Sequence, residues 1–123
     1  MRKSDENLQG TLDLLVLRTL GGGESLNGYS IAERIHALCA DALRVEEGSL
    51  YPALHRMDEA GWVKSQWGLS ENNRRARFYT ITQHGRRHLT RLEANWLNHV
   101  QAVARILGIG VTGRLIGSGR LSD

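Results

Sequence analysis

The sequence is poor in several residue types, and each shortage excludes something. Its 123 residues include one cysteine, one proline and one phenylalanine. The lone Cys39 cannot form an internal disulfide, and no apolar run near the start resembles the core of a secretory signal. The longest apolar stretch, Leu12 to Leu20, is interrupted by Asp13 and is too short to cross a bilayer. We therefore expect a cytoplasmic protein without membrane contact, in which Cys39 fills space rather than senses redox state.

Signatures of catalysis and of metal binding are also missing. No glycine-rich phosphate loop follows a strand, no nucleophile elbow is present, and the glycines at 21–23 follow an expected helix. His84 and His88 have the i,i+4 spacing that two metal ligands on a helix need, but no third ligand accompanies them. The sequence therefore predicts no enzyme, no metal site and no cofactor.

Basic residues are concentrated in one part of the chain. The net charge is +3, from sixteen Lys and Arg against thirteen Asp and Glu. The window 62–91 holds seven of the basic residues and one acidic residue, Glu71, so it carries +6 and leaves −3 for the rest. A local cationic surface favours an anionic partner such as nucleic acid.

Apolar residues recur at helical spacing in three early segments. Thr11 is placed to cap the first expected helix, with Asp13 in its first turn, and Asn27 is placed to cap the second. The apolar stripes are Leu12, Leu15, Val16 and Leu20 in residues 11–20, Ile31, Ile35 and Leu38 or Cys39 in residues 28–39, and Leu50, Leu54 and Met57 in a third helix. Three amphipathic helices therefore open the chain.

The ends of the third helix can be placed from two special residues. Pro52 has no N–H to donate and is tolerated only near a helix start, so the helix begins between Val45 and Ser49. Gly61 is the expected C′ residue. The side chains of this helix that lie away from its apolar stripe include Ser49, Tyr51, His55 and Arg56.

After Gly61 the hydrophobic period changes from 3.6 to 2. Residues 62–67 and 77–82 are rich in β-branched and aromatic side chains, and the connection 68–75 is rich in turn formers. An antiparallel hairpin is expected, with Arg74, Arg75 and Arg77 at its tip and on its return strand. Trp62 and Trp67 are expected to pack against helices.

A long last helix, residues 83–107, follows the potential cap Thr82. At about 1.5 Å per residue it spans roughly 37 Å, whereas a globule of about 80 residues has a radius of gyration near 12 Å. Its apolar stripe consists of Leu89, Leu92, Trp96, His99, Val103 and Ile106. Because such a stripe reaches beyond its own domain, we expect a homodimer through this helix. Residues 108–123 are glycine-rich and are expected to form a flexible tail.

The order helix, helix, helix, hairpin is that of a winged helix-turn-helix, a mainly α (α+β) fold. In such a fold the third helix enters the major groove while cations beside it neutralise phosphates. The expected DNA contacts are Ser49, Tyr51, His55, Arg56, Lys64, Arg74, Arg75 and Arg77. Two of these have simpler alternatives, because Tyr51 could be a core residue and Arg56 could pair with Glu59.

Several segments together resemble the PadR-like winged-helix transcription regulators. They are GTLDLLVLRTL, GYSIAERI, VEEGSLYPALHRMDEAGWV, WGLSENNRRARFYTIT and HGRRHL, and they cover residues 8–107. The resemblance implies a dimeric repressor that binds an operator in double-stranded DNA. Residues 8–82 would be the DNA-binding domain, with recognition helix Glu47–Ala60 and wing Trp62–Thr82, and residues 83–107 the single dimerisation helix of the family's short branch.

The resemblance also implies a regulatory ligand. Some relatives sense phenolic acids or flat hydrophobic drugs between dimerisation helices and DNA-binding domains, so Trp96 could stack on a small aromatic effector. The simpler interpretation is that Trp96 packs in the dimer interface. Two other functions stay open at this point: a winged-helix module that binds an acidic protein, and a dimer that binds small molecules without an operator.

Overall fold

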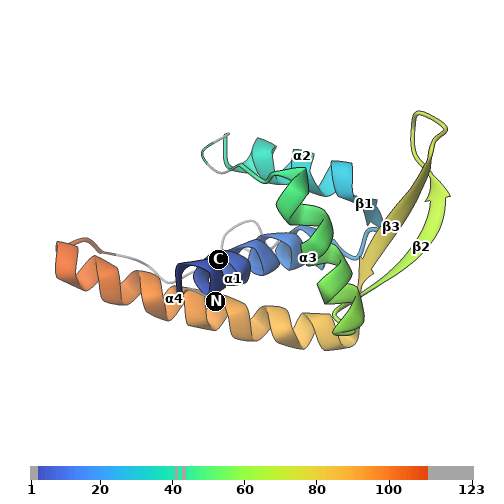
Figure 1. Ribbon diagram of the computed structural model, residues 1–123. Coiled ribbons are helices and arrows are strands. Elements are labelled where there is room, and N and C mark those ends of the chain that lie inside the picture. The colour runs from blue at the N-terminus through green and yellow to red at the C-terminus, as the bar shows by residue number, and fades with distance from the viewer. Residues whose placement is uncertain (1–2, 41, 43, 111–123) are drawn as a thin grey trace. The chain divides into compact units, whose positions relative to one another are not determined.

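The computed structural model describes residues 3–40, 42 and 44–110, which fall into two compact units that divide between Thr90 and Arg91. The elements are α1 (Lys3–Thr19), the 3₁₀ helix η1 (Leu20–Gly22), β1 (Leu26–Asn27), α2 (Gly28–Leu38), α3 (Glu47–Glu59), β2 (Val63–Leu69), β3 (Arg75–Ile81) and α4 (Gln83–Leu107) (Figure 1). The expected order of three helices, a hairpin and a long helix is confirmed. The unit boundary falls inside α4, so residues 83–90 belong with the preceding elements. The expected tail at 108–123 lies almost entirely outside the described residues.

The core of the first unit forms where α1, α2 and α3 meet the base of the sheet. Fully buried side chains come from all three helices, from η1 and from β2, namely Val16, Leu17, Leu20, Ile31, Leu50, Leu54, Met57 and Val63. The expected apolar stripe of α3 is thereby confirmed. Leu38 does not join the core, although it belongs to the expected apolar stripe of α2. It is the last residue of that helix and is 83% exposed.

Three helix ends follow the residue types that stand there. The Asn27 side chain accepts a hydrogen bond from the backbone N–H of Ser30 at 2.9 Å, and Thr82 Oγ1 accepts one from Gly85 at 2.9 Å. Gly61 has a left-handed backbone with φ of 82°, and α3 ends there in a Schellman motif. These caps confirm the sequence-based predictions for α2, α3 and α4.

The start of α1 was predicted wrongly. The helix begins at Lys3, so Thr11 lies in its interior and is not its N-cap. Asp13 is likewise not in the first turn, and it is buried, with 5% of its surface exposed. Two hydrogen bonds from the Arg56 guanidinium, of 2.9 and 3.0 Å, satisfy the Asp13 carboxylate. This pair joins α1 to α3, and hydrogen bonding by Asp13 raises the pKa of Arg56 although burial opposes the shift.

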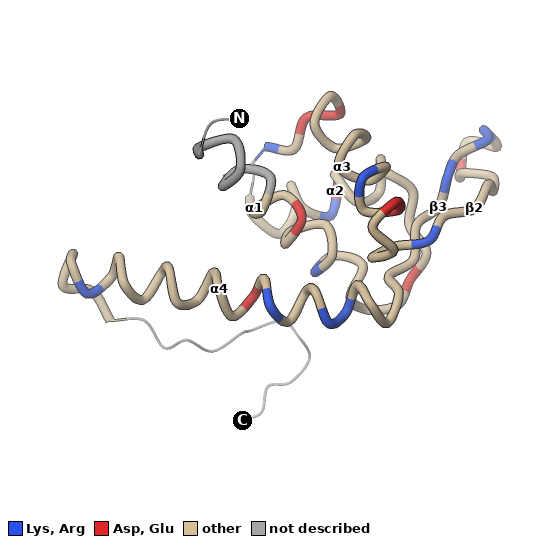
Figure 2. Tube along the Cα trace, turned by 60° about the horizontal axis from the view of Figure 1, so that its bottom comes forward, with Lys and Arg blue, Asp and Glu red and all other residues tan. Residues whose placement is uncertain are grey.

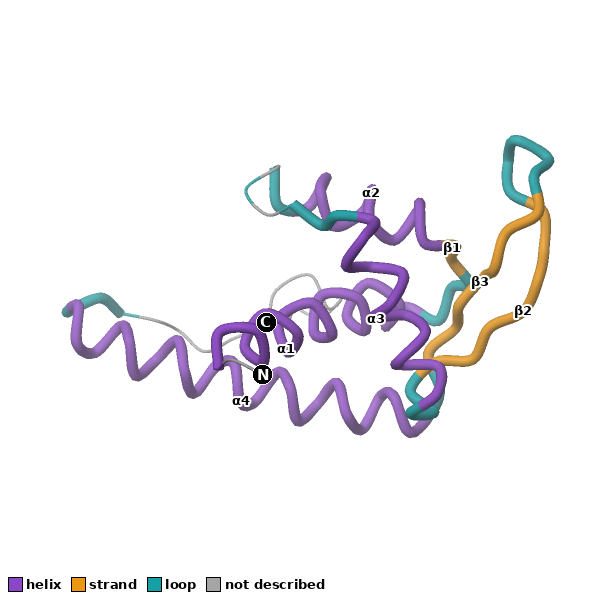
Figure 3. Tube along the Cα trace, in the orientation of Figure 1, coloured by secondary structure: helices purple, strands orange, loops and turns teal. Residues whose placement is uncertain are grey.

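The sheet has three antiparallel strands in the order β1-β3-β2, one more than the sequence predicted. The short β1 pairs Leu26 with Tyr79, and its two residues are too few to show a period. The β2–β3 hairpin is longer than expected and closes through a tight turn at 70–74 (Figure 3). Asn73 occupies the left-handed region there with φ of 64°, a conformation that asparagine tolerates better than most residues.

The first two turns of α4 are fixed against the foot of the hairpin. The Trp62 ring stacks on His88 with centroids 3.8 Å apart, which confirms that Trp62 packs against a helix. Arg86 donates to the Gly21 carbonyl at 2.9 Å. None of the helices in the described part of the chain combines the length and the apolar character that crossing a membrane requires.

The backbone of Gly85 lies so close to the Trp62 carbonyl that a Cβ there would collide with it. This close approach predicts opposite effects for two Gly→Ala substitutions in helices. Gly85→Ala should lower the free energy of unfolding by about 1–3 kcal/mol, because backbone must move to admit the methyl group. Gly10→Ala, at a position of α1 with nothing within 4 Å, should raise it by up to about 1 kcal/mol. Urea denaturation of both variants measures this, and a stabilised Gly85→Ala would refute the described contact.

The buried ion pair gives a second stability prediction. Asp13→Asn should lower the free energy of unfolding by about 1–3 kcal/mol, because Arg56 loses its compensating charge. A double-mutant cycle with Arg56→Gln should show a coupling of about 1 kcal/mol or more. Additive effects in thermal or urea unfolding would mean that the pair does not contribute.

Candidate nucleic-acid interface

The solvent side of α3 carries polar and aromatic side chains because Leu50, Leu54 and Met57 occupy the core side. Ser49 and His55 are exposed, and Tyr51 is 45% exposed, so Tyr51 is not a core residue. His55 Nε2 lies 3.3 Å from Glu59 in the following turn. A helix face of this kind presents hydrogen-bonding groups rather than an apolar patch.

Tyr51 is seated directly on the first residue of α2. A Cβ at Gly28 would lie 2.6 Å from the Tyr51 ring, so the ring fills the space that a side chain would need. The neighbouring Tyr29 donates its hydroxyl proton to Glu33 at 2.9 Å, and this bond raises the pKa of Tyr29. The two tyrosines form one wall of a groove.

The opposite wall of this groove is the β2–β3 hairpin. The groove has a volume of about 480 Å³ and brings together predicted contacts from α3 and the hairpin, namely Tyr51, Arg74, Arg75 and Arg77, beside Trp67 and Tyr79. Figure 2 shows the basic residues along the hairpin and at its tip. A surface that is concave, cationic and aromatic suits a phosphate backbone with attached sugars.

Trp67 holds the arginines of the hairpin. The guanidinium carbon of Arg75 lies 4.4 Å from the ring centroid and that of Arg77 5.1 Å. The expectation that Trp67 packs against a helix is wrong, because the residue is 52% exposed and the described contacts of its ring are with these cations. Cation–π contact on an exposed ring contributes about 0.5–1 kcal/mol and limits the directions in which the guanidinium groups point.

Not all predicted contacts join this groove. Lys64 is exposed but alternates with Ser65, so it lies on the other face of the hairpin from Trp67. Arg56 donates its hydrogen bonds to Asp13 rather than to Glu59. Its guanidinium is therefore not free for DNA, and the expected alternative pairing with Glu59 is also wrong. The seven basic residues of the +6 window are also divided, since four lie on the hairpin and three, Arg86, Arg87 and Arg91, lie on α4.

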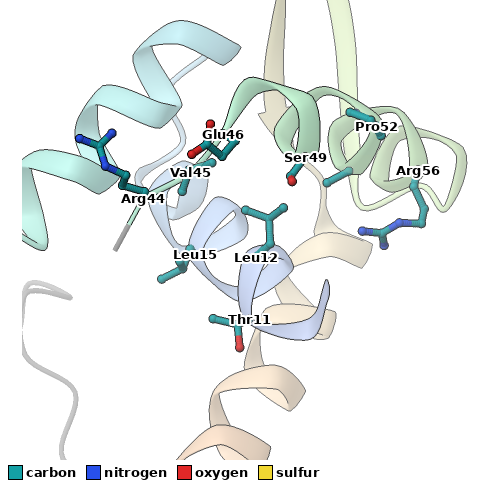
Figure 4. A pocket seen from close by; sticks show the side chains of 10 residues that line it. Thr11, Leu12, Leu15, Arg44, Val45, Glu46, Ser49, Pro52 and Arg56 are labelled. Carbon is teal, nitrogen blue, oxygen red and sulfur yellow. The ribbon is translucent and has the colours of Figure 1, made fainter. Parts of the chain in front are cut away.

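Ser49 and Arg56 line a second cavity, between α1 and α3 (Figure 4). Its volume is about 400 Å³, and Leu12, Leu15 and Val45 form apolar walls. Arg56 is already paired with Asp13, and the other charged side chains that line the cavity, Arg44 and Glu46, have opposite signs. Among the described residues, no group of three His, Cys, Asp or Glu side chains is placed to hold a metal ion.

The groove contains residues that sequence reasoning missed. The sequence pattern does not mark Tyr29, Asn72 or Tyr79 as contacts, and it predicts packing for Trp67, yet all four line the groove. The register could have revealed part of this, because Trp67 pairs with Arg77 and strand alternation places Arg75 on the same face. Tyr29 could not be found, because its position depends on where α2 meets the sheet.

The stripe of α4 differs in one residue from the expectation. Leu89 is buried inside the first unit, where a Cβ at Gly21 would contact it, so it is not available to a partner. In the second unit Trp96, Val103 and Ile106 remain exposed, Ile106 at 87%. Leu92 is half-buried and His99 is exposed.

Comparison with known proteins agrees with this architecture. A transcriptional regulator from Clostridium thermocellum is 26% identical, with a TM-score of 0.72 over 85% of this chain and 97% of that chain. A PadR family transcriptional regulator from Eggerthella lenta is 28% identical, with a TM-score of 0.67 over 87% and 91%. The fold is also similar to that of Bacillus subtilis PadR in complex with operator DNA, at 22% identity and a TM-score of 0.59 over 71% of this chain and 46% of that chain.

The family match covers most of the first unit. Residues 16–91 match the family described as "Transcriptional regulator PadR-like family". The expected winged-helix fold is therefore confirmed, and so is the expectation that this is not an enzyme, since these relatives are transcriptional regulators. The chain belongs to the PadR-like family of transcriptional regulators.

Proposed function

We propose that this regulator binds an operator in double-stranded DNA as a homodimer in the cytoplasm and represses transcription. The observation that carries the proposal is the groove in which Tyr51 of α3 faces the arginines of the hairpin. Arg74 and Arg75 matter most, because no carboxylate in the described part of the chain lies within salt-bridge distance of them. Bacillus subtilis PadR in complex with operator DNA supports this use of the fold.

The parts of the surface have different roles in this proposal. Ser49, Tyr51 and His55 reach base edges or sugars from α3, since a recognition helix reads the major groove with its early residues. Arg74 and Arg75 neutralise phosphates beside the groove, and Lys64 adds positive charge from the other face of the hairpin. Arg56 is excluded, because leaving Asp13 would strand a buried carboxylate without a partner.

The dimer in this proposal forms through the second unit. Trp96, Val103 and Ile106 present apolar surface on one stripe of α4. Soluble proteins seldom leave such a stripe uncovered, and twofold pairing is the commonest solution. The half-exposed Trp96 also offers a flat face on which an aromatic effector could stack, which is the observation that supports relief of repression by a small ligand.

DNA binding can be tested on the two arginines that have no carboxylate beside them. Arg74→Ala combined with Arg75→Ala should weaken binding to a duplex selected from a random library. The plot of log affinity against log salt should become shallower by about 0.9 for each phosphate that is no longer neutralised. Arg87→Ala is the matched control, because α4 starts at the foot of the hairpin rather than at its tip. Fluorescence anisotropy measures both quantities, and an unchanged slope in the double variant would contradict the phosphate role.

Dimer formation can be tested on the exposed stripe. The wild-type chain should have twice the protomer mass of 13.7 kDa in light scattering at micromolar concentration. Ile106→Glu with Val103→Glu should give the monomer mass, because two charges would be buried without partners. Asn98→Glu adds negative charge to α4 outside the stripe and should leave the dimer intact. A monomeric wild-type chain would remove this part of the proposal.

A further inference from the structure

Arg77 has surroundings unlike those of the other arginines in the hairpin. Its Nη2 donates a hydrogen bond to Ser65 Oγ at 2.8 Å, across from β3 to β2. The same nitrogen lies 3.9 Å from Asp58 Oδ2, in the last turn of α3. Its charge is therefore already partly compensated within the protein.

Ser65 connects these two groups. Its hydroxyl donates to Asp58 Oδ2 at 2.8 Å while it accepts the bond from Arg77. One hydroxyl has one proton to donate, so both of its directions are fixed by the two charged partners. The result is a polar chain that runs from α3 through β2 to β3.

The surroundings of this chain keep it in place. On the outer side, the face of Trp67 lies against the Arg77 guanidinium, and the two residues are direct cross-strand partners. On the inner side lies the buried Tyr79, opposite Ser65 in the register. Burial raises the pKa of Tyr79, and Arg77 opposes that shift while Asp58 adds to it, which places all three in one electrostatic cluster.

We propose that Arg77, through Ser65 and Asp58, is a positioning residue that fixes the hairpin relative to α3 and is not itself a phosphate contact. The inference rests on the proposed DNA binding and refines it. The connection at residues 60–62 joins α3 to β2 alone, whereas the Asp58–Ser65–Arg77 chain also holds β3 and so restrains the arginines at the tip relative to Tyr51. Arg74 and Arg75 then contact the phosphates, and Arg77 fixes the position of the hairpin that carries them.

The two possible roles of Arg77 predict opposite changes in DNA affinity for the substitution Asp58→Asn. If Arg77 binds phosphate, Asp58→Asn frees its charge and removes a repelling carboxylate, so affinity for DNA should rise. If Arg77 is a tie, Asp58→Asn loosens the hairpin and affinity should fall, by roughly five- to thirtyfold for coupled neighbours. Glu71→Gln is the matched control, since it removes one negative charge at the exposed hairpin tip.

The experiment measures affinity and salt dependence for Asp58→Asn, Ser65→Ala, Ser65→Thr and Glu71→Gln in the full-length chain. We expect weaker binding for Asp58→Asn and Ser65→Ala, and recovery in Ser65→Thr because the hydroxyl is kept. Arg77→Gln should weaken binding without the decrease of about 0.9 in slope per subunit that removal of a phosphate contact would cause. Tighter binding by Asp58→Asn, as for Glu71→Gln, would overturn the inference.

Hydrogen exchange without DNA separates this inference from the proposed function. Amides of the β2–β3 hairpin should exchange roughly three- to tenfold faster in Asp58→Asn and Ser65→Ala, while those of α2 keep the wild-type rate. If the wild-type chain binds no duplex but the exchange changes as expected, DNA binding is wrong and the tie stands. Unchanged exchange rates in both variants would overturn the positioning role of Arg77, Ser65 and Asp58, whatever the DNA-binding result.

Discussion

The burial of Leu50, Leu54 and Met57 is the constraint on which the interface depends. These side chains hold one face of α3 in the core, and the helical period then determines which residues of α3 are exposed to solvent. Ser49 and His55 are exposed for this reason and not because of any property of their own. Burial of three large apolar side chains contributes several kcal/mol, so a single surface contact is too weak to change the orientation of α3.

Polar contacts supply what apolar burial leaves undefined. A stripe of leucines fixes rotation about the helix axis but permits sliding and tilting, whereas hydrogen bonds between charged groups have direction and length. Asp13 and Arg56 fix the C-terminal part of α3 to α1, and Asp58 and Ser65 connect the same part of the helix to the hairpin. The helix is thus restrained by groups that sequence periodicity does not reveal.

Local rules recovered most of the fold from the sequence. Asn27, Gly61 and Thr82 act where their residue types predict, because capping involves only neighbours along the chain. Long-range contacts were missed. The partner of Asp13 is 43 residues away, and Leu89 follows the period of α4 although its own domain covers it. A pattern identifies an apolar face but not the neighbour that buries it.

The contact of Tyr51 with Gly28 has a consequence for redesigning the proposed DNA-reading face of α3. Exchanging Tyr51 would leave a gap over a residue that has no side chain to fill it, so the first turn of α2 would have to repack. Ser49 and His55 impose no such constraint in the described structure, apart from the surface pair of His55 with Glu59. Libraries that vary these two positions can therefore change the proposed DNA-reading face while the scaffold stays intact.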